Sequence, residues 1–250
     1  MNKKQKIEKD VIRIGKKAKE ASYKISSLNS KTKNDILLDA SDNLRKNKDI
    51  IMQKNSLDIK ENEKKLNSAL LDRLMLDSNR IDAICDGLNE IAKLEDPVGK
   101  SLGEWERPNG LKIQKVSIPL GVIGVIYESR PNVAADAAGL CLKSGNTLIL
   151  RGGSESFNSS SKIVEIINQS IKKFGLPEGT LQNIPTIDRT AVGALLKMDK
   201  YVDVIIPRGG KSLIERVSEE SKVHVIKHLD GICHTYIHKS SDLDISKKVA

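Results

Sequence analysis

Two segments of the chain place an arginine and two glycines directly after an apolar run. They are residues 148–155, LILRGGSE, and residues 205–212, IIPRGGKS. Glycines let a ligand approach the backbone, while an arginine and the free N–H groups of a helix N-terminus favour a phosphate. Two such turns predict a phosphorylated, dinucleotide-sized ligand. The alternative is that each Gly-Gly pair only makes a tight turn, and neither segment matches the GxGxxG or GxxxxGK[ST] fingerprints.

All four histidines fall between His224 and His238, and a metal site has to be weighed there. His224 and His228 are four residues apart, and so are His234 and His238, but their surroundings indicate strands. Four residues along a strand span about 13 Å, too far for two ligands of one metal. We therefore expect no metal.

The three cysteines, Cys85, Cys141 and Cys233, are too few and too scattered for a disulfide framework or a paired metal site. Cys233 lies close to histidines and could be an activated nucleophile. Free cysteines are more often small buried apolar residues. We favour that interpretation for all three.

Helices are predicted for residues 1–95, because apolar residues recur there every three or four positions. Residues 30–34 separate the first helix from the second and could cap it. A third helical run over 69–91 stops at Asp96-Pro97, since proline disfavours a helical residue before it.

Residues 104–118 predict a β-hairpin. Asn109-Gly110 favours a type I′ turn, in which both central residues have positive φ. A lone hairpin is marginally stable in water, so we expect it to pair with another strand, of this chain or of a partner.

From residue 118 onward, strand-like apolar runs alternate with helical segments. The runs are 121–126, 147–150, 180–184, 203–206, 223–226 and 235–237, and the helical segments are 134–142, 159–174, 190–198 and 213–218. This alternation predicts an α/β fold with a parallel sheet covered by helices on both faces. Residues 240–242 are typical of a helix cap, and the amphipathic pattern after them has no stop signal, so we expect the chain to end inside a helix.

The chain has 250 residues, a net charge of +9 and only 3% aromatic residues. No apolar run is long enough to span a bilayer, and no apolar segment follows the basic N-terminus as in a secretory signal. We expect a cytoplasmic protein with no membrane partner. Basic residues near the N-terminus are interleaved with acidic ones, and stacking aromatics are scarce, so nucleic-acid binding is not favoured.

Several motifs together resemble the γ-glutamyl phosphate reductase family of the aldehyde dehydrogenase superfamily. They are 119–133 (PLGVIGVIYESRPNV), 141–146 (CLKSGN), 150–153 (LRGG), 198–201 (MDKY), 206–210 (IPRGG), 228–234 (HLDGICH) and, more loosely, 71–74 (LDRL). The resemblance implies NADPH-dependent reduction of γ-glutamyl phosphate to glutamate-5-semialdehyde and phosphate, in proline biosynthesis. It also implies a homo-oligomer, association with glutamate 5-kinase, and a division into 1–103 (helical part of the cofactor domain), 104–118 (oligomerisation hairpin) and 119–250 (NADPH-binding α/β part).

The resemblance also implies roles for single residues. Asn132 corresponds to the asparagine that stabilises the oxyanion at the reacting carbonyl. The residues expected to face the adenosine ribose and its 2′-phosphate are Arg151, Gly152, Gly153 and Ser154, while Gly209, Gly210, Lys211 and Ser212, which follow Arg208, would lie along the pyrophosphate.

The family's nucleophilic cysteine is expected beyond the region that matches residues 240–250, and Cys233 matches a different, non-nucleophilic position. The expectation is thus an N-terminal portion of a reductase, without the catalytic domain and inactive alone. The alternative is a non-catalytic nucleotide-binding remnant of that enzyme.

Overall fold

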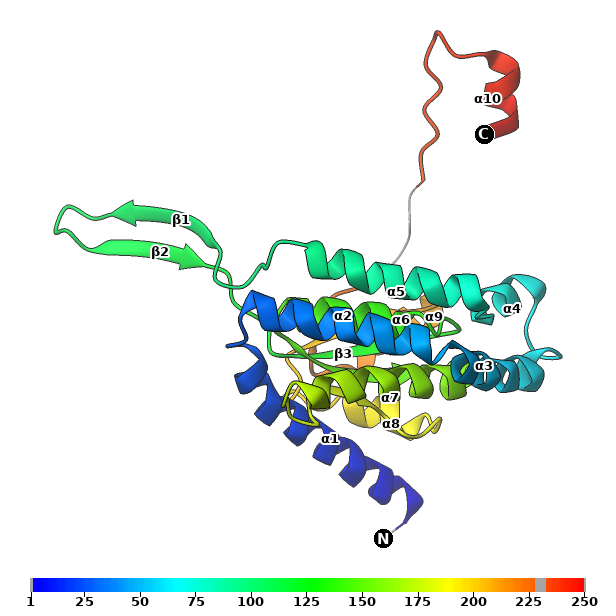
Figure 1. The fold of residues 1–250 in the computed structure, drawn as a ribbon, viewed down its shortest axis with the longest axis horizontal. Helices are drawn as coiled ribbons and strands as arrows, with labels where there is room; N and C mark the ends of the chain where they lie inside the picture. Colours follow the sequence, from blue (N-terminus) through cyan, green and yellow to red (C-terminus); the bar gives the residue numbers. More distant parts are fainter. Residues whose placement is uncertain (1, 228–232, 250) are drawn as a thin grey trace.

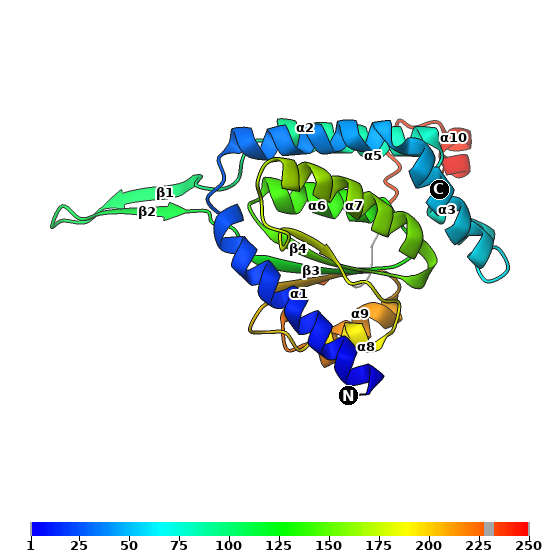
Figure 2. The same ribbon diagram turned by 60° about the horizontal axis from the view of Figure 1, so that its bottom comes forward.

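The computed structural model describes residues 2–227 and 233–249, and their centre is a five-stranded parallel sheet (Figures 1 and 2). The strand order is β5-β4-β3-β6-β7, with all neighbours parallel. The strands are β3 (Val122–Tyr127), β4 (Thr147–Gly152), β5 (Leu181–Asn183), β6 (Val204–Arg208) and β7 (His224–Val225). The predicted α/β class is confirmed, and β3 is buried along its whole length because strands of the sheet flank it and helices cover both faces.

Helices cover both faces of the sheet. On one face, α6 (Val133–Lys143) and α7 (Phe157–Lys173) form the inner layer, and α2 (Ser30–Lys46) and α5 (Ser78–Lys93) lie outside them (Figure 2). The other face is covered by α1 (Lys3–Ile25), α8 (Thr190–Leu195) and α9 (Lys211–Glu220). Each face therefore has its own hydrophobic core.

The first helix, α1, is fixed to strands that come much later in the chain. Its Ile14 carbonyl accepts a hydrogen bond from Gln182 Nε2 at 2.8 Å, and Lys19 Nζ lies 2.9 Å from both carboxylate oxygens of Asp203. Val11 and Ala18 are buried in the core beneath it. The N-terminal helix is thus an integral layer of the sheet domain.

The helical region differs from the prediction at its boundaries. The second helix begins at Ser30, inside the segment expected to be a break, because the Asn29 side chain accepts a hydrogen bond from Thr32 N at 2.8 Å. The run expected as one helix over 69–91 is two, α4 (Ser68–Leu74) and α5, and Asp77 caps the second by accepting from Arg80 N at 2.7 Å. A further helix, α3 (Lys48–Asn62), precedes them, and the short 3-10 helix η1 (Ser154–Ser156) leads into α7.

The predicted hairpin exists, as β1 (Ser101–Glu106) and β2 (Lys112–Val116), and it projects from the body (Figure 1). The type I′ turn is wrong: Gly110 has φ +81°, but Asn109 has no positive φ. Gly110 N instead donates to Arg107 O at 2.9 Å, which closes a turn with Pro108 in its second position. Proline fixes φ near −65°, which excludes a type I′ turn there and leaves the positive φ to glycine. In the part of the chain that the structure describes, no third strand pairs with this hairpin.

The C-terminal segment lies apart from the body (Figure 1). The strand expected at 235–237 is wrong, because this segment is extended but unpaired and Tyr236 is 83% exposed. The expected cap is confirmed: Asp242 Oδ1 accepts from Ile245 N at 2.9 Å at the start of α10 (Leu243–Val249). None of the described helices is both long and apolar enough to cross a bilayer.

Candidate functional site

The two Arg-Gly-Gly turns lie at the same edge of the sheet, on either side of the end of β3. Tyr127, the last residue of β3, is paired with Gly152 on one side and with Arg208 on the other. Parallel strands end at a common edge, and ligands of open α/β sheets bind there. A cleft of about 630 Å³ opens at this edge, lined by residues 128–130 and 207–210 and by Glu155.

Glu128 connects β3 with the second turn, and the sequence analysis missed it. Its backbone N donates to Arg208 O at 3.1 Å, and its Oε2 accepts a hydrogen bond from Gly210 N at 3.0 Å. Gly210 is the N-cap of α9, so the carboxylate occupies the position at a helix N-terminus that favours an anion. A β-carbon added at Gly209 would collide with the side-chain ends Glu128 Oε2 and Leu213 Cδ2, so a larger residue there would have to displace both of them. The signal in the sequence was a charged residue directly after a buried strand.

The residue after Glu128 has an unusual backbone conformation. Ser129 has φ 47° and is the only described non-glycine residue with positive φ. The left-handed conformation costs a non-glycine residue about 1–2 kcal/mol, and such residues cluster at ligand sites. Its place in the lining of the cleft marks this junction as a candidate functional site.

Arg151 does not line the cleft in this structure. It is 7% exposed, and its guanidinium donates to Ile187 O at 2.9 Å and to Gly152 O. Burial lowers its pKa, while the nearby Glu155 opposes that shift. Arg151 thus holds the loop after β5 against the end of β4.

Three buried polar atoms at this edge have no hydrogen-bond partner among the described residues: Tyr127 Oη, Arg151 Nε and Glu155 Oε2. Tyr127 is 1% exposed, and burial raises its pKa to about 12, so it is a neutral phenol. A β-carbon on Gly152 would lie 2.9 Å from Tyr127 Oη. Buried polar groups are normally paired, so an unpaired group of three is consistent with a ligand site.

The other residues expected at the site are accessible. Arg208, Gly209, Gly210, Lys211 and Ser212 are exposed, and the last two lie in the first turn of α9. In the first Arg-Gly-Gly turn, Ser154 is exposed and its Oγ lies 3.4 Å from Glu155 Oε1. The second turn therefore offers backbone N–H groups and two cations to an anionic ligand, which fits a phosphate group.

A second cleft, of about 520 Å³, adjoins the first and contains Asn132 and Asp136. Asn132 lies at the N-terminus of α6, and its Nδ2 donates to Asp136 Oδ2 at 2.9 Å. Burial raises the pKa of Asp136, and the hydrogen bond from Asn132 partly opposes this. Arg73 and Arg130 line both clefts. Sequence reasoning found Asn132 but missed the charged residues around it.

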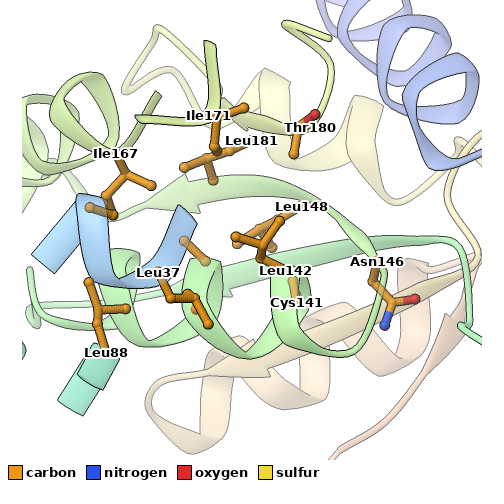
Figure 3. Close-up of a pocket in the computed structure, with 13 residues that line it drawn as sticks. Leu37, Leu88, Cys141, Leu142, Asn146, Leu148, Ile167, Ile171, Thr180 and Leu181 are labelled. Carbon is orange, nitrogen blue, oxygen red and sulfur yellow. The ribbon is translucent and has the colours of Figure 1, made fainter. Parts of the chain in front are cut away.

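Two of the three cysteines are core residues, as predicted. Cys141 lines a gap of only about 10 Å³ between α6, its neighbouring helices and β4 (Figure 3). Such a gap is at the lower limit for a single water molecule and is packing space, not a ligand site. Burial raises the pKa of the Cys141 thiol to about 12 and also raises that of Cys85.

The expected burial of Cys233 is wrong, because it lies in the exposed segment that leaves the body. Of the histidines weighed for a metal, His228 lies outside the described residues. The described ones form no group of three or more His, Cys, Asp or Glu side chains that could hold a metal ion.

Solved structures similar to this chain share its fold. γ-Glutamyl phosphate reductase from Thermotoga maritima superposes with a TM-score of 0.84 at 36% identity, covering 86% of this chain and 52% of that protein. The reductase from Saccharomyces cerevisiae gives 0.81 at 34% identity, covering 100% of this chain and 62% of that protein. A NAD-dependent aldehyde dehydrogenase from Sinorhizobium meliloti, at 16% identity and a TM-score of 0.67, shares the fold alone.

Curated relatives show the same similarity in sequence. γ-Glutamyl phosphate reductases from Rhodospirillum rubrum and Paramagnetospirillum magneticum are 53% and 50% identical to the chain over 233 and 237 residues. These matches cover 93% and 94% of this chain but only 55% and 56% of the relatives, so the chain spans about half of their length. A profile of the aldehyde dehydrogenase family matches residues 2–249. Since that match extends over nearly every residue, the chain belongs to the aldehyde dehydrogenase family.

Proposed function

We propose that the chain is the cofactor-binding portion of an enzyme that reduces γ-glutamyl phosphate to glutamate-5-semialdehyde, with NADPH as reductant and phosphate as second product. One observation carries the proposal: two Arg-Gly-Gly turns converge on Glu128 at the carboxyl edge of the sheet. It is supported by relatives about half identical in sequence that are γ-glutamyl phosphate reductases. We expect the enzyme to act in the cytoplasm.

The residues proposed to hold NADPH come from both turns. Gly209, Gly210, Lys211 and Ser212 would bind the pyrophosphate at the N-terminus of α9, where backbone N–H groups and the helix dipole favour an anion. Arg208 is exposed beside them, so its guanidinium is available to the phosphates of the cofactor.

Arg151, Gly152, Gly153 and Ser154 would bind the adenosine end. Ser154 is exposed at this turn, while Tyr127 Oη and Arg151 Nε close to it are buried and have no hydrogen-bond partner among the described residues.

The bound nicotinamide would supply a hydride to the reacting carbonyl carbon. The proposed role of Asn132 is to donate a hydrogen bond to the oxygen on which negative charge develops. Its amide has two N–H donors, and only one is used, by Asp136. Asp136 thereby fixes the plane of the amide and leaves the other donor for the oxyanion.

The family's nucleophilic cysteine has no counterpart at the three cysteine positions of this chain, so we propose that these 250 residues alone do not carry out the thioester chemistry. The hairpin β1–β2 is proposed to join an oligomeric interface, since Trp105 on it is 48% exposed. A glutamate 5-kinase is a further proposed partner. The second candidate function, a nucleotide-binding remnant without catalysis, rests on the same cleft.

The test is an NADPH fluorescence titration of the purified chain, repeated with NADH. Saturable binding with a preference for NADPH is expected. Arg208→Gln should weaken binding of both cofactors, while Arg107→Gln in the hairpin turn, far from the cleft, serves as the matched control. Absence of saturable binding by a folded chain would contradict both candidate functions. Complementation of a proline auxotroph by this chain would contradict its proposed inability to act alone.

A further inference from the structure

The second cleft is bounded by α4, α5 and the N-terminus of α6, and it carries more positive charge than its own side chains neutralise. Three arginines line it, Arg73, Arg80 and Arg130. Arg80 is engaged: its guanidinium lies 2.6 Å from Asp72 Oδ1 and donates to Met75 O at 3.0 Å. In the described part of the chain, neither Arg73 nor Arg130 has a carboxylate within 4 Å. Two guanidinium groups without counter-ions at one cleft favour an anionic ligand.

These two arginines also occupy a particular place. Both line the second cleft with Asn132 and the first cleft with Glu128 and the second Arg-Gly-Gly turn. A group bound by both would therefore lie at the junction of the two clefts, beside the proposed oxyanion donor.

The acyl carbon of an acyl phosphate has to meet both the hydride donor and that oxyanion donor. The phosphate leaves from this same carbon, so it has to be bound close to both. Arginine suits this task because its planar donors match phosphate oxygens two at a time.

We propose that the second cleft is the substrate site and that Arg73 and Arg130 bind the phosphate of the acyl phosphate. This inference rests on the proposed function and adds the residues that recognise the substrate. Both residues are long and exposed, so each can turn towards the junction without unfolding its helix or loop.

The probe is 2-amino-6-phosphonohexanoate, a stable phosphonate with the same number of atoms between its amino-acid end and its phosphorus as γ-glutamyl phosphate. Its binding to the chain is measured by isothermal titration calorimetry, with 2-aminohexanoate and butylphosphonate as the two half-molecules. Arg73→Gln and Arg130→Gln are each expected to weaken binding of the full probe and of butylphosphonate about tenfold, which corresponds to about 1.4 kcal/mol. Arg107→Gln is the matched control and should bind as the unchanged chain does.

Each other result overturns the inference in a distinct way. Unchanged binding by both variants means that the arginines do not recognise the substrate. Weakened binding of 2-aminohexanoate but not of butylphosphonate means that they hold the carboxylate end instead. If the full probe fails to bind a chain that binds NADPH, the inference falls and the proposed function stands. If NADPH also fails to bind a chain with a native circular dichroism spectrum, both fall.

Discussion

Asp58 on α3 stabilises the start of α7 from outside that helix. It is fully buried, and its carboxylate accepts from Asn158 N at 3.0 Å, Asn158 Nδ2 at 2.9 Å and Ser159 N at 2.8 Å, and also from Ser159 Oγ. Ser156, the residue at the N-cap position, makes no side-chain cap hydrogen bond. A residue distant in sequence therefore supplies both the cap and the negative charge that a helix N-terminus favours.

Replacing Asp58 with alanine should cost about 3–5 kcal/mol of unfolding free energy. The two backbone N–H groups lose their acceptor, and each buried unsatisfied donor costs about 1–3 kcal/mol. The favourable interaction of the charge with the helix dipole, up to about 2 kcal/mol in a partly buried site, is lost as well. Asp58→Asn keeps an acceptor oxygen but turns an amide N–H₂ towards donors, so a smaller loss of about 1–3 kcal/mol is expected.

The assay is urea unfolding followed by far-ultraviolet circular dichroism. Asp42→Ala on α2 is the matched control, because it removes the same charge from an exposed position and should change the free energy of unfolding by less than about 0.5 kcal/mol. The expected order of stability is unchanged chain, Asp58→Asn, Asp58→Ala. An Asp58→Ala chain within about 1 kcal/mol of the unchanged one, with the same urea dependence, would refute the reasoning, since that is below the cost of even two unsatisfied donors.

Three further predictions concern Glu128, the three cysteines and the buried Lys33. Glu128→Gln should tighten NADPH binding severalfold in the fluorescence titration, because it removes a charged competitor for the Gly210 N–H, and weaker binding would mean that the carboxylate contacts the cofactor. A thiol reagent at pH 8 should modify Cys233 alone in the folded chain, and Cys85 and Cys141 only in urea, since burial raises the pKa of both and shields them. Lys33→Ala removes a fully buried cation from its partner Asp96 and should lower the free energy of unfolding by about 3 kcal/mol. A loss of free energy as small as that from breaking an exposed ion pair would contradict this reasoning from burial.

The order of strands and helices from residue 118 could be predicted because the apolar runs are continuous and well separated. The site was only partly predictable, because spacing indicates the ends of strands but not which side chains meet there. Glu128 reaches the N-terminus of α9, 82 residues later in the chain, and nothing local predicts that contact. Arg73 and Arg130 likewise come together only through the packing of α4 and α5 beside the end of β3.

Local errors had local causes. The turn was assigned from the dipeptide Asn109-Gly110, whereas the structure closes it one residue earlier, between Arg107 and Gly110, with Pro108 in its second position. The strand expected at 235–237 has the right residues but no neighbouring strand among the described residues, and strands depend on such partners more than on propensity.

The position of α1 bears on how the chain folds during synthesis. Its apolar stripe is covered by α8 and its Lys19 is paired with Asp203, so α1 is synthesised well before the segments that it packs against. At about 5–20 residues per second, the roughly 200 residues up to β6 take about 10–40 s to be made. During that interval the stripe is open to chaperones and to other nascent chains. Slower translation before residue 203 should therefore lower the soluble yield of the whole chain more than that of a chain without α1's apolar stripe.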